Sequence, residues 1–355
     1  MEFTNQVVGI SGSMDFTDNW RSTLRLGQSR DDNYNYANIS AFNSRFDTTR
    51  WNASWLNELQ LTDDHQLIFG SDYRVDEVDS TTNFAKTERY DVGIFGELHS
   101  RILENHFLNA SLRWDENEAF GDYVTGNFSW RYNWDYGISP FASFGNAFKA
   151  PSLNDLYYQD PWGSHGDPNL SPEESTSFEI GLAGNQDWAQ WEVRAYHTNI
   201  DNLITWRTDR NTFISIPIQT QKAQIDGLEV EISKELFGWN NKLGFQILNP
   251  TDRVTNRRLP RRADKILTYD LSRSFGQIDV GGNVLARANS FEEDWLGNRT
   301  EVSGFVTVGL RTTYHFNKNW MLSANLNNLL DKQYQLVDTY NTADRNFFIS
   351  IHYNN

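Results

Sequence analysis

The chain of 355 residues contains no cysteine, which excludes disulfide-linked scaffolds, thiolate metal sites and cysteine nucleophiles. It also lacks any run near the roughly 18 consecutive apolar residues that a transmembrane helix requires, so helical membrane spans are excluded. Basic residues are scarce, with 31 Lys and Arg against 47 Asp and Glu and a net charge of −16. Such an acidic chain is a poor partner for the phosphate backbone of nucleic acids.

Aromatic residues, by contrast, are abundant: 13 Trp, 15 Tyr and 23 Phe make a disordered chain implausible. The apolar residues recur with a period of two. In residues 304–316, Val306, Val308 and Leu310 alternate with Thr307 and Arg311. The same alternation recurs in residues 108–114, 128–132, 228–233, 320–327 and 346–353. Because successive side chains of a strand point to opposite faces, the pattern predicts an all-β protein, and we count about 17 strands.

The connections between these segments alternate between long and short. Short ones fall at residues 15–20, 133–137, 184–188, 236–241, 274–277 and 315–320, and long ones at residues 29–50, 76–89, 147–175, 206–222, 249–262, 289–303 and 329–346. Outer-membrane barrels have short periplasmic turns and long outer loops, whereas a soluble sandwich has no reason to sort its loops. Tryptophans at or beside short turns are typical of an interfacial aromatic belt (Trp20, Trp134, Trp188, Trp239, Trp320). The sequence therefore predicts an antiparallel transmembrane β-barrel in the outer membrane.

Three motifs connect the chain to a known family. The longest connection contains F-K-A-P-S-L-N-D-L-Y at residues 148–157 and G-D-P-N-L-S-P-E-E-S at residues 166–175, and N-L-L-D-K-Q-Y follows at residues 328–334. They resemble the barrel motifs of TonB-dependent outer-membrane receptors, although Asp167 stands where the family usually has Asn. The resemblance implies active transport driven through TonB by a 22-stranded barrel that follows a plug domain and a TonB box. We expect residues 1–355 to be the C-terminal part of the barrel domain, without plug or TonB box.

Within this family the chain is most similar to the cobalamin (vitamin B12) receptors. The similarity lies in K-A-Q-I-D-G-L-E at residues 222–229, L-P-R-R-A at residues 259–263 and Y-Q-L-V-D-T-Y-N-T-A-D-R at residues 334–345. It implies that Arg261 and Trp295 contact cobalamin. It also implies Ca²⁺ in the outer loops, for which Asp31, Asp32 and Asp47 are the candidate ligands. The implied partners are the TonB complex, reached through the plug, and outer-membrane lipid and lipopolysaccharide.

Other interpretations stay open at this point. A ferric-siderophore receptor would share the same family motifs. A passive porin-like barrel and a soluble all-β binding protein are alternatives of other classes. The basic stretch at residues 257–262 is compatible with ligand contact, with pairing to acidic neighbours and with lipopolysaccharide phosphate. The seven histidines have no metal-ligand spacing and no catalytic motif is present, so we do not expect an enzyme.

Overall fold

Strands dominate the computed structural model, which describes residues 2–36, 43–294 and 297–354. Within these residues the main sheet is antiparallel and has 18 strands, one of them the two-residue β15 (Arg257–Arg258). The predicted all-β antiparallel fold of about 17 spanning strands is thereby confirmed. The sequence did not predict the short helix α1 (Leu153–Tyr157). In the described part of the chain, no helix is long and apolar enough to cross a membrane.

The chain divides into two compact units. Unit 1 comprises Met1–Tyr132, Ser143–Phe178 and Asn199–Lys222, and unit 2 comprises Asn133–Ala142, Glu179–Thr198 and Ala223–Asn355. Four strands contribute residues to both: β9 (Ile138–Lys149), β11 (Glu173–Gln186), β12 (Ala189–Thr208) and β13 (Ser215–Leu236).

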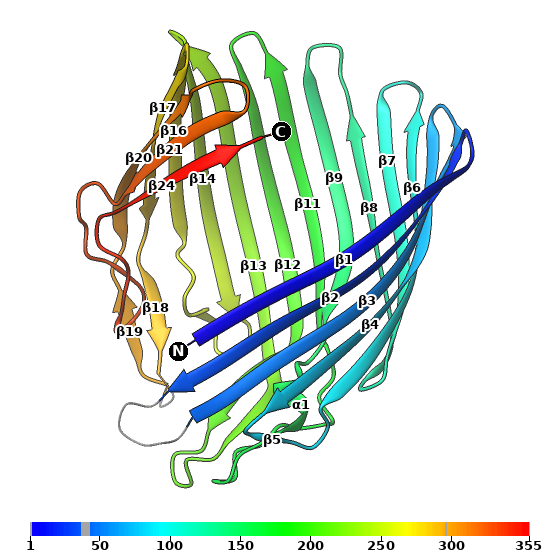
Figure 1. Ribbon diagram of the computed structural model, residues 1–355, viewed down its shortest axis with the longest axis vertical. Coiled ribbons are helices and arrows are strands. Elements are labelled where there is room, and N and C mark those ends of the chain that lie inside the picture. The colour runs from blue at the N-terminus through cyan, green and yellow to red at the C-terminus, as the bar shows by residue number, and fades with distance from the viewer. Residues whose placement is uncertain (1, 37–42, 295–296, 355) are drawn as a thin grey trace. The chain divides into compact units, whose positions relative to one another are not determined.

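Unit 1 contains a series of long strands that pair in chain order. They are β1 (Glu2–Thr17), β2 (Trp20–Tyr36), β3 (Asn43–Thr62), β4 (His65–Ser80), β6 (Glu88–Ile102), β7 (His106–Asn117) and β8 (Gly121–Tyr132). Each is antiparallel to the next, and Figure 1 shows β1 to β4 running side by side. A separate pair joins β5 (Asn83–Phe84) to β10 (Tyr158–Gln159), directly after α1.

Unit 2 repeats this pattern. Its long strands β14 (Trp239–Asp252), β16 (Lys265–Phe275), β17 (Ile278–Arg287), β20 (Phe305–His315), β21 (Trp320–Asn327) and β24 (Asn346–Tyr353) pair in this order. Two small hairpins lie in the long connections. They are β18 (Ser290–Glu293) with β19 (Arg299–Val302), and β22 (Gln335–Val337) with β23 (Tyr340–Asn341).

The predicted short turns are confirmed, but three of the predicted long connections are not. The short turns fall where expected, for example between Phe275 and Ile278 and between His315 and Trp320. Residues 29–50 are wrong as a connection, because β2 continues to Tyr36 and β3 begins at Asn43. Residues 76–89 are likewise mostly strand, and so are residues 206–222, because β12 continues to Thr208 and β13 begins at Ser215. The polar composition of these stretches misled the prediction, because strands can pair beyond the apolar zone, where both faces are polar.

The two faces of the unit 2 sheet differ in chemistry. Leu310 lies opposite Leu326 on one face, and 46 % of its surface is exposed despite its apolar character. On the other face Arg311 pairs with Asp270 through N–O distances of 2.6 and 2.7 Å. An exposed apolar face opposite a face with ion pairs is the arrangement in which lipid contacts one side and water the other.

The face assignment makes a testable prediction for β20. Leu310→Arg, at the centre of the strand on the apolar face, should destabilise the protein by roughly 2–4 kcal/mol, the cost of Arg near the bilayer midplane. Thr307→Arg, on the opposite face, should cost far less. Reversible unfolding in lipid vesicles measures both free energies, and equal costs at the two positions would contradict the assignment.

Candidate functional site

The motif segment of residues 148–175 forms the base of a long connection in unit 1. Ser152 caps α1, because its hydroxyl accepts from the Asp155 N–H while the Asp155 carboxylate accepts from the Ser152 N–H. Leu156 is 1 % exposed and faces the interior of this segment. A Cβ at Gly166 would lie 2.6 Å from the carbonyl carbon of Leu156, so the backbone approaches α1 too closely for any other residue.

Buried polar groups attach this motif segment to the strands. The Glu173 carboxylate accepts from the Lys149 ammonium at 3.1 Å and from the Ile204 N–H at 3.0 Å. Arg89 on β6 donates to the Pro151 carbonyl at 2.6 Å and lies 3.5 Å from Asp76 on β4. The motifs at residues 148–175 are therefore structural in this chain, since they fix the long connection onto the sheet.

Four arginines of unit 2 lie together around the long connections, and we call them the arginine cluster: Arg258, Arg261, Arg287 and Arg299. The guanidinium groups of Arg258 and Arg299 lie 5.6 and 5.1 Å from the ring centroid of Phe291. Arg287 donates to the Arg261 carbonyl at 3.3 Å, and Arg258 is ion-paired with Asp264 at 2.8 Å. Cation–π contacts and a main-chain acceptor thus hold like charges close together.

Arg261 is the exposed member of the arginine cluster. Its Nε donates to the two Glu292 oxygens at 3.0 and 2.9 Å, and its Nη2 donates to Glu292 at 2.6 Å. These hydrogen bonds raise the pKa of the Arg261 guanidinium above its ordinary value, so the group stays charged. The bidentate pair fixes the plane of the guanidinium and leaves the two N–H groups of Nη1 facing away from Glu292. Sequence reasoning found Arg261 but missed Glu292, whose only signal was the acidic run after Phe291.

The other predicted site residues lie in different positions. Asp32 and Asp47 are directly opposite each other on β2 and β3, and Asp79 on β4 continues the row. Asp31 is one position along β2, opposite Thr48, and therefore faces the other side of the sheet. Trp295 lies outside the described residues.

Arginines already neutralise this acidic row. Arg45 bonds to Asp47 and, at 2.8 Å, to Asp79, and Arg30 donates to Asp32 at 2.7 Å. Arg30, Arg45, Asp47 and Asp79 border a cavity of about 410 Å³, and the buried Oδ1 of Asp47 has no hydrogen-bond partner. Across the residues that the structure describes, no three or more His, Asp and Glu groups are placed to hold a metal ion.

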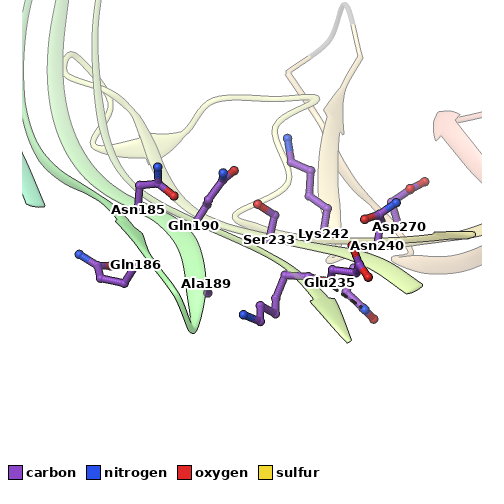
Figure 2. Close-up of a pocket in the computed structure, with 11 residues that line it drawn as sticks. Asn185, Gln186, Ala189, Gln190, Ser233, Glu235, Asn240, Lys242 and Asp270 are labelled. Atoms are coloured by element: carbon purple, nitrogen blue, oxygen red, sulfur yellow. Dashed lines mark hydrogen bonds between the residues drawn. The ribbon is translucent and has the colours of Figure 1, made fainter. Parts of the chain in front are cut away.

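A polar hollow of about 390 Å³ lies beside the short turns of unit 2. Figure 2 shows it between two groups of side chains, Asn185, Gln186, Ala189 and Gln190 on one side and Ser233, Glu235, Asn240, Lys242 and Asp270 on the other. Lys242 is ion-paired with Glu231 at 3.0 Å. Amides and paired charges of this kind suit the wet side of a membrane sheet.

Comparison with known proteins decides the family. The model of the family described as "TonB dependent receptor-like, beta-barrel" matches residues 2–329. The chain belongs to this family. Its members are outer-membrane receptors and transporters, so the chain is an outer-membrane β-barrel protein, as the sequence predicted.

Similar curated proteins of the family include two vitamin B12 transporters named BtuB. The one from Photobacterium profundum is 28 % identical over 94 % of this chain and 54 % of its own length. The one from Vibrio vulnificus is 28 % identical over 99 % of this chain and 60 % of its own length. The chain thus spans little more than half the length of these relatives.

Solved structures of TonB-dependent receptors share the fold. The copper transporter OprC gives a TM-score of 0.82 at 17 % identity. The match covers 99 % of this chain and 65 % of the OprC chain. The siderophore receptor PirA from Acinetobacter baumannii gives a TM-score of 0.77 at 14 % identity. The match covers 99 % of this chain and 62 % of the PirA chain. At these identities the likeness concerns the fold alone.

The structural role of the family motifs predicts the effect of Arg89→Met. Loss of the bond to the Pro151 carbonyl should loosen residues 150–172 and destabilise the protein by about 1–3 kcal/mol, because a buried acceptor is left unsatisfied. Limited proteolysis with mapping of the cleavage sites measures the loosening.

Arg50→Met is the matched control, because Arg50 also bonds Asp76, at 2.6 Å, but within the described residues makes no ion pair with residues 150–172. It should destabilise the sheet without exposing those residues to the protease. Identical cleavage patterns for the two variants would show that Arg89 does not hold the motif segment.

Proposed function

We propose that the chain forms barrel wall and outer loops of a receptor that imports cobalamin by the TonB-dependent route. The observation that carries the proposal is Arg261 in L-P-R-R-A, held by Glu292 with Nη1 directed away from the pair. The similarity to vitamin B12 transporters over 94 % and 99 % of the chain supports it. The proposed partners are cobalamin, the TonB complex reached through a plug domain, and outer-membrane lipid.

In this proposal each part of the chain has a defined task. The sheet provides a wall with an apolar outer face and a polar inner face. The motif segment at residues 148–175 keeps a long connection fixed on the strands. Arg261 offers charged donors to the amide and phosphate oxygens of cobalamin, and Trp295 offers a flat ring to its macrocycle. Energy would come from the inner membrane through TonB, which rearranges the plug.

A ferric siderophore is the alternative ligand. The solved siderophore receptor PirA shares the fold. A cluster of arginines also suits the negative charge that many iron chelates carry. The observation that favours cobalamin is local: Arg261 lies in the L-P-R-R-A motif and has one acidic partner, Glu292, that orients it for a neutral or singly charged acceptor.

Removing Arg261 or Trp295 tests the ligand in the full-length receptor. Arg261→Ala should weaken cobalamin binding roughly 10- to 100-fold, since hydrogen bonds to charged groups contribute about 1.5–3 kcal/mol. Trp295→Ala should weaken it severalfold, in line with about 1 kcal/mol for an aromatic contact. Equilibrium titration with cyanocobalamin measures both changes.

Two controls sharpen this experiment. Arg21→Ala removes an exposed arginine whose ion pair with Asp15 spans 3.9 Å, and it should leave cobalamin affinity unchanged. Titration of the same preparation with ferric enterobactin tests the alternative ligand. Binding of the siderophore without binding of cobalamin would overturn the substrate and leave the receptor family intact.

We propose that calcium can enter the acidic row only by competing with Arg45. Asp32, Asp47 and Asp79 supply adjacent carboxylates, and Oδ1 of Asp47 is free. These carboxylates offer fewer free oxygens than the six to eight that Ca²⁺ prefers, because Arg45 is bonded to the other oxygen of Asp47. The residues as they stand therefore do not fit calcium, and the ion would have to displace Arg45.

The competition between Arg45 and calcium is testable by calorimetric titration with CaCl₂. Arg45→Gln should raise calcium affinity about tenfold, since it removes a positive charge from the acidic row. Adding Asp47→Asn should abolish the gain. Asp31→Asn, on the opposite face, is the control and should have no effect. The absence of calcium binding in Arg45→Gln would refute the calcium proposal.

A further inference from the structure

A second cavity lies on unit 2, on the sheet formed by β14, β16, β17 and β20. It is an open hollow of about 590 Å³ on the surface of the sheet. Its lining includes Lys265, Leu267, Ala286, Gly304, Val306 and Lys332. Nothing in the proposed cobalamin site uses this surface.

Small residues produce the hollow. Ala286 is opposite Leu267 on one side and Val306 on the other, so these three side chains share the apolar face. One step further along, the Ala288 N–H bonds to the Lys265 carbonyl, and Gly304 lies against Ala288. A Cβ on Gly304 would meet the Arg287 carbonyl oxygen at 2.5 Å, so no side chain can fill this position. A strip without side-chain bulk thus runs between Leu267 and Val306.

The charge of the lining is opposite to that of the chain. The protein carries −16, yet the residues around this cavity include Lys265, Arg287 and Lys332 and no carboxylate. Arg287 faces the other side of the sheet, where it bonds to the Arg261 carbonyl. Lys265 shares the apolar face with Leu267, two positions away. Among the described residues, neither Lys265 nor Lys332 has an acidic side chain within ion-pair distance.

The position of the cavity along the strands identifies the membrane leaflet. Lys265 begins β16, Arg287 ends β17 and Phe305 begins β20, and all three adjoin long connections. Long connections of outer-membrane barrels lie on the outside. The cavity is therefore level with the outer leaflet, whose main lipid is lipopolysaccharide, a phosphorylated sugar that carries several acyl chains.

We propose that this cavity is a binding site for the lipid A part of lipopolysaccharide. One acyl chain lies in the strip between Leu267 and Val306, and a lipid A phosphate contacts the ammonium groups of Lys265 and Lys332. Lysine suits this role, because its ammonium is a compact charge on a flexible stem that covers apolar surface. The arginine cluster is a poorer candidate, since Glu292 and Asp264 already neutralise Arg261 and Arg258.

Native mass spectrometry of the intact receptor, titrated in detergent with lipid A 1,4′-bisphosphate, tests this site. The double variant Lys265→Gln/Lys332→Gln should weaken lipid A binding about 25-fold, or about fivefold for each lysine near an anionic lipid surface. Ala286→Leu keeps both charges but fills the strip, and it should also weaken binding severalfold. Lys318→Gln, beside a short turn at the other end of the strands, is the matched control and should have no effect.

Competing lipids complete the test. Dephosphorylated lipid A and phosphatidylglycerol should each bind at least tenfold more weakly than the bisphosphate. Equal losses for Lys318→Gln and the double variant, equal binding of phosphatidylglycerol, or full binding by Ala286→Leu would overturn the proposal. Cobalamin affinity should be the same in all these variants. The experiment therefore tests the lipid A site separately from the proposed transport of cobalamin.

Discussion

The need to pair every backbone N–H and C=O group without help from water governs this structure. Inside a bilayer an unpaired peptide group costs several kcal/mol, and a sheet can span it only when each strand bonds to its neighbours. The antiparallel registers run from β1 to β8 in unit 1, with shifts at Asp15/Thr17 and at Gln60/Thr62, and from β14 to β24 in unit 2, and they supply these bonds between neighbouring strands of each unit. The side chains are then free to differ between the two faces, which makes a lipid-facing wall with a polar inner side possible.

This freedom separates structural polar residues from functional ones. Arg89 and Glu173 are buried and bonded to main-chain or charged partners, although Nε of Arg89 has no hydrogen-bond partner, so they hold a long connection in place. Arg261 is exposed, and within the described residues its side-chain hydrogen bonds go to Glu292, so it can meet a ligand without loss of the fold. The motif segment of residues 148–175 thus belongs to unit 1, whereas Arg261, the proposed ligand contact, belongs to unit 2.

The fold was largely predictable from residue order, because the period-two alternation is a local property of each strand. The family was predictable as well, since its motifs are short and contiguous. The extent of β2 and β3 was not predictable, because polar residues such as Asp32 and Asp47 pair as strand only when a neighbouring strand presents its own backbone. The candidate site was predicted in part: Arg261 was identified, but its partner Glu292 is 31 positions away in the chain.

By itself, the sequence determined the strand faces, the positions of the short turns and the receptor family, because each follows from contiguous residues and their spacing. Only the tertiary structure decided that Arg45 and Arg30 neutralise the acidic row and that Asp31 faces away from it. It alone decided that Ala286, Ala288 and Gly304 leave a hollow beside Lys265 and Lys332. These arrangements depend on the register between strands, which brings distant residues together and which no local pattern specifies.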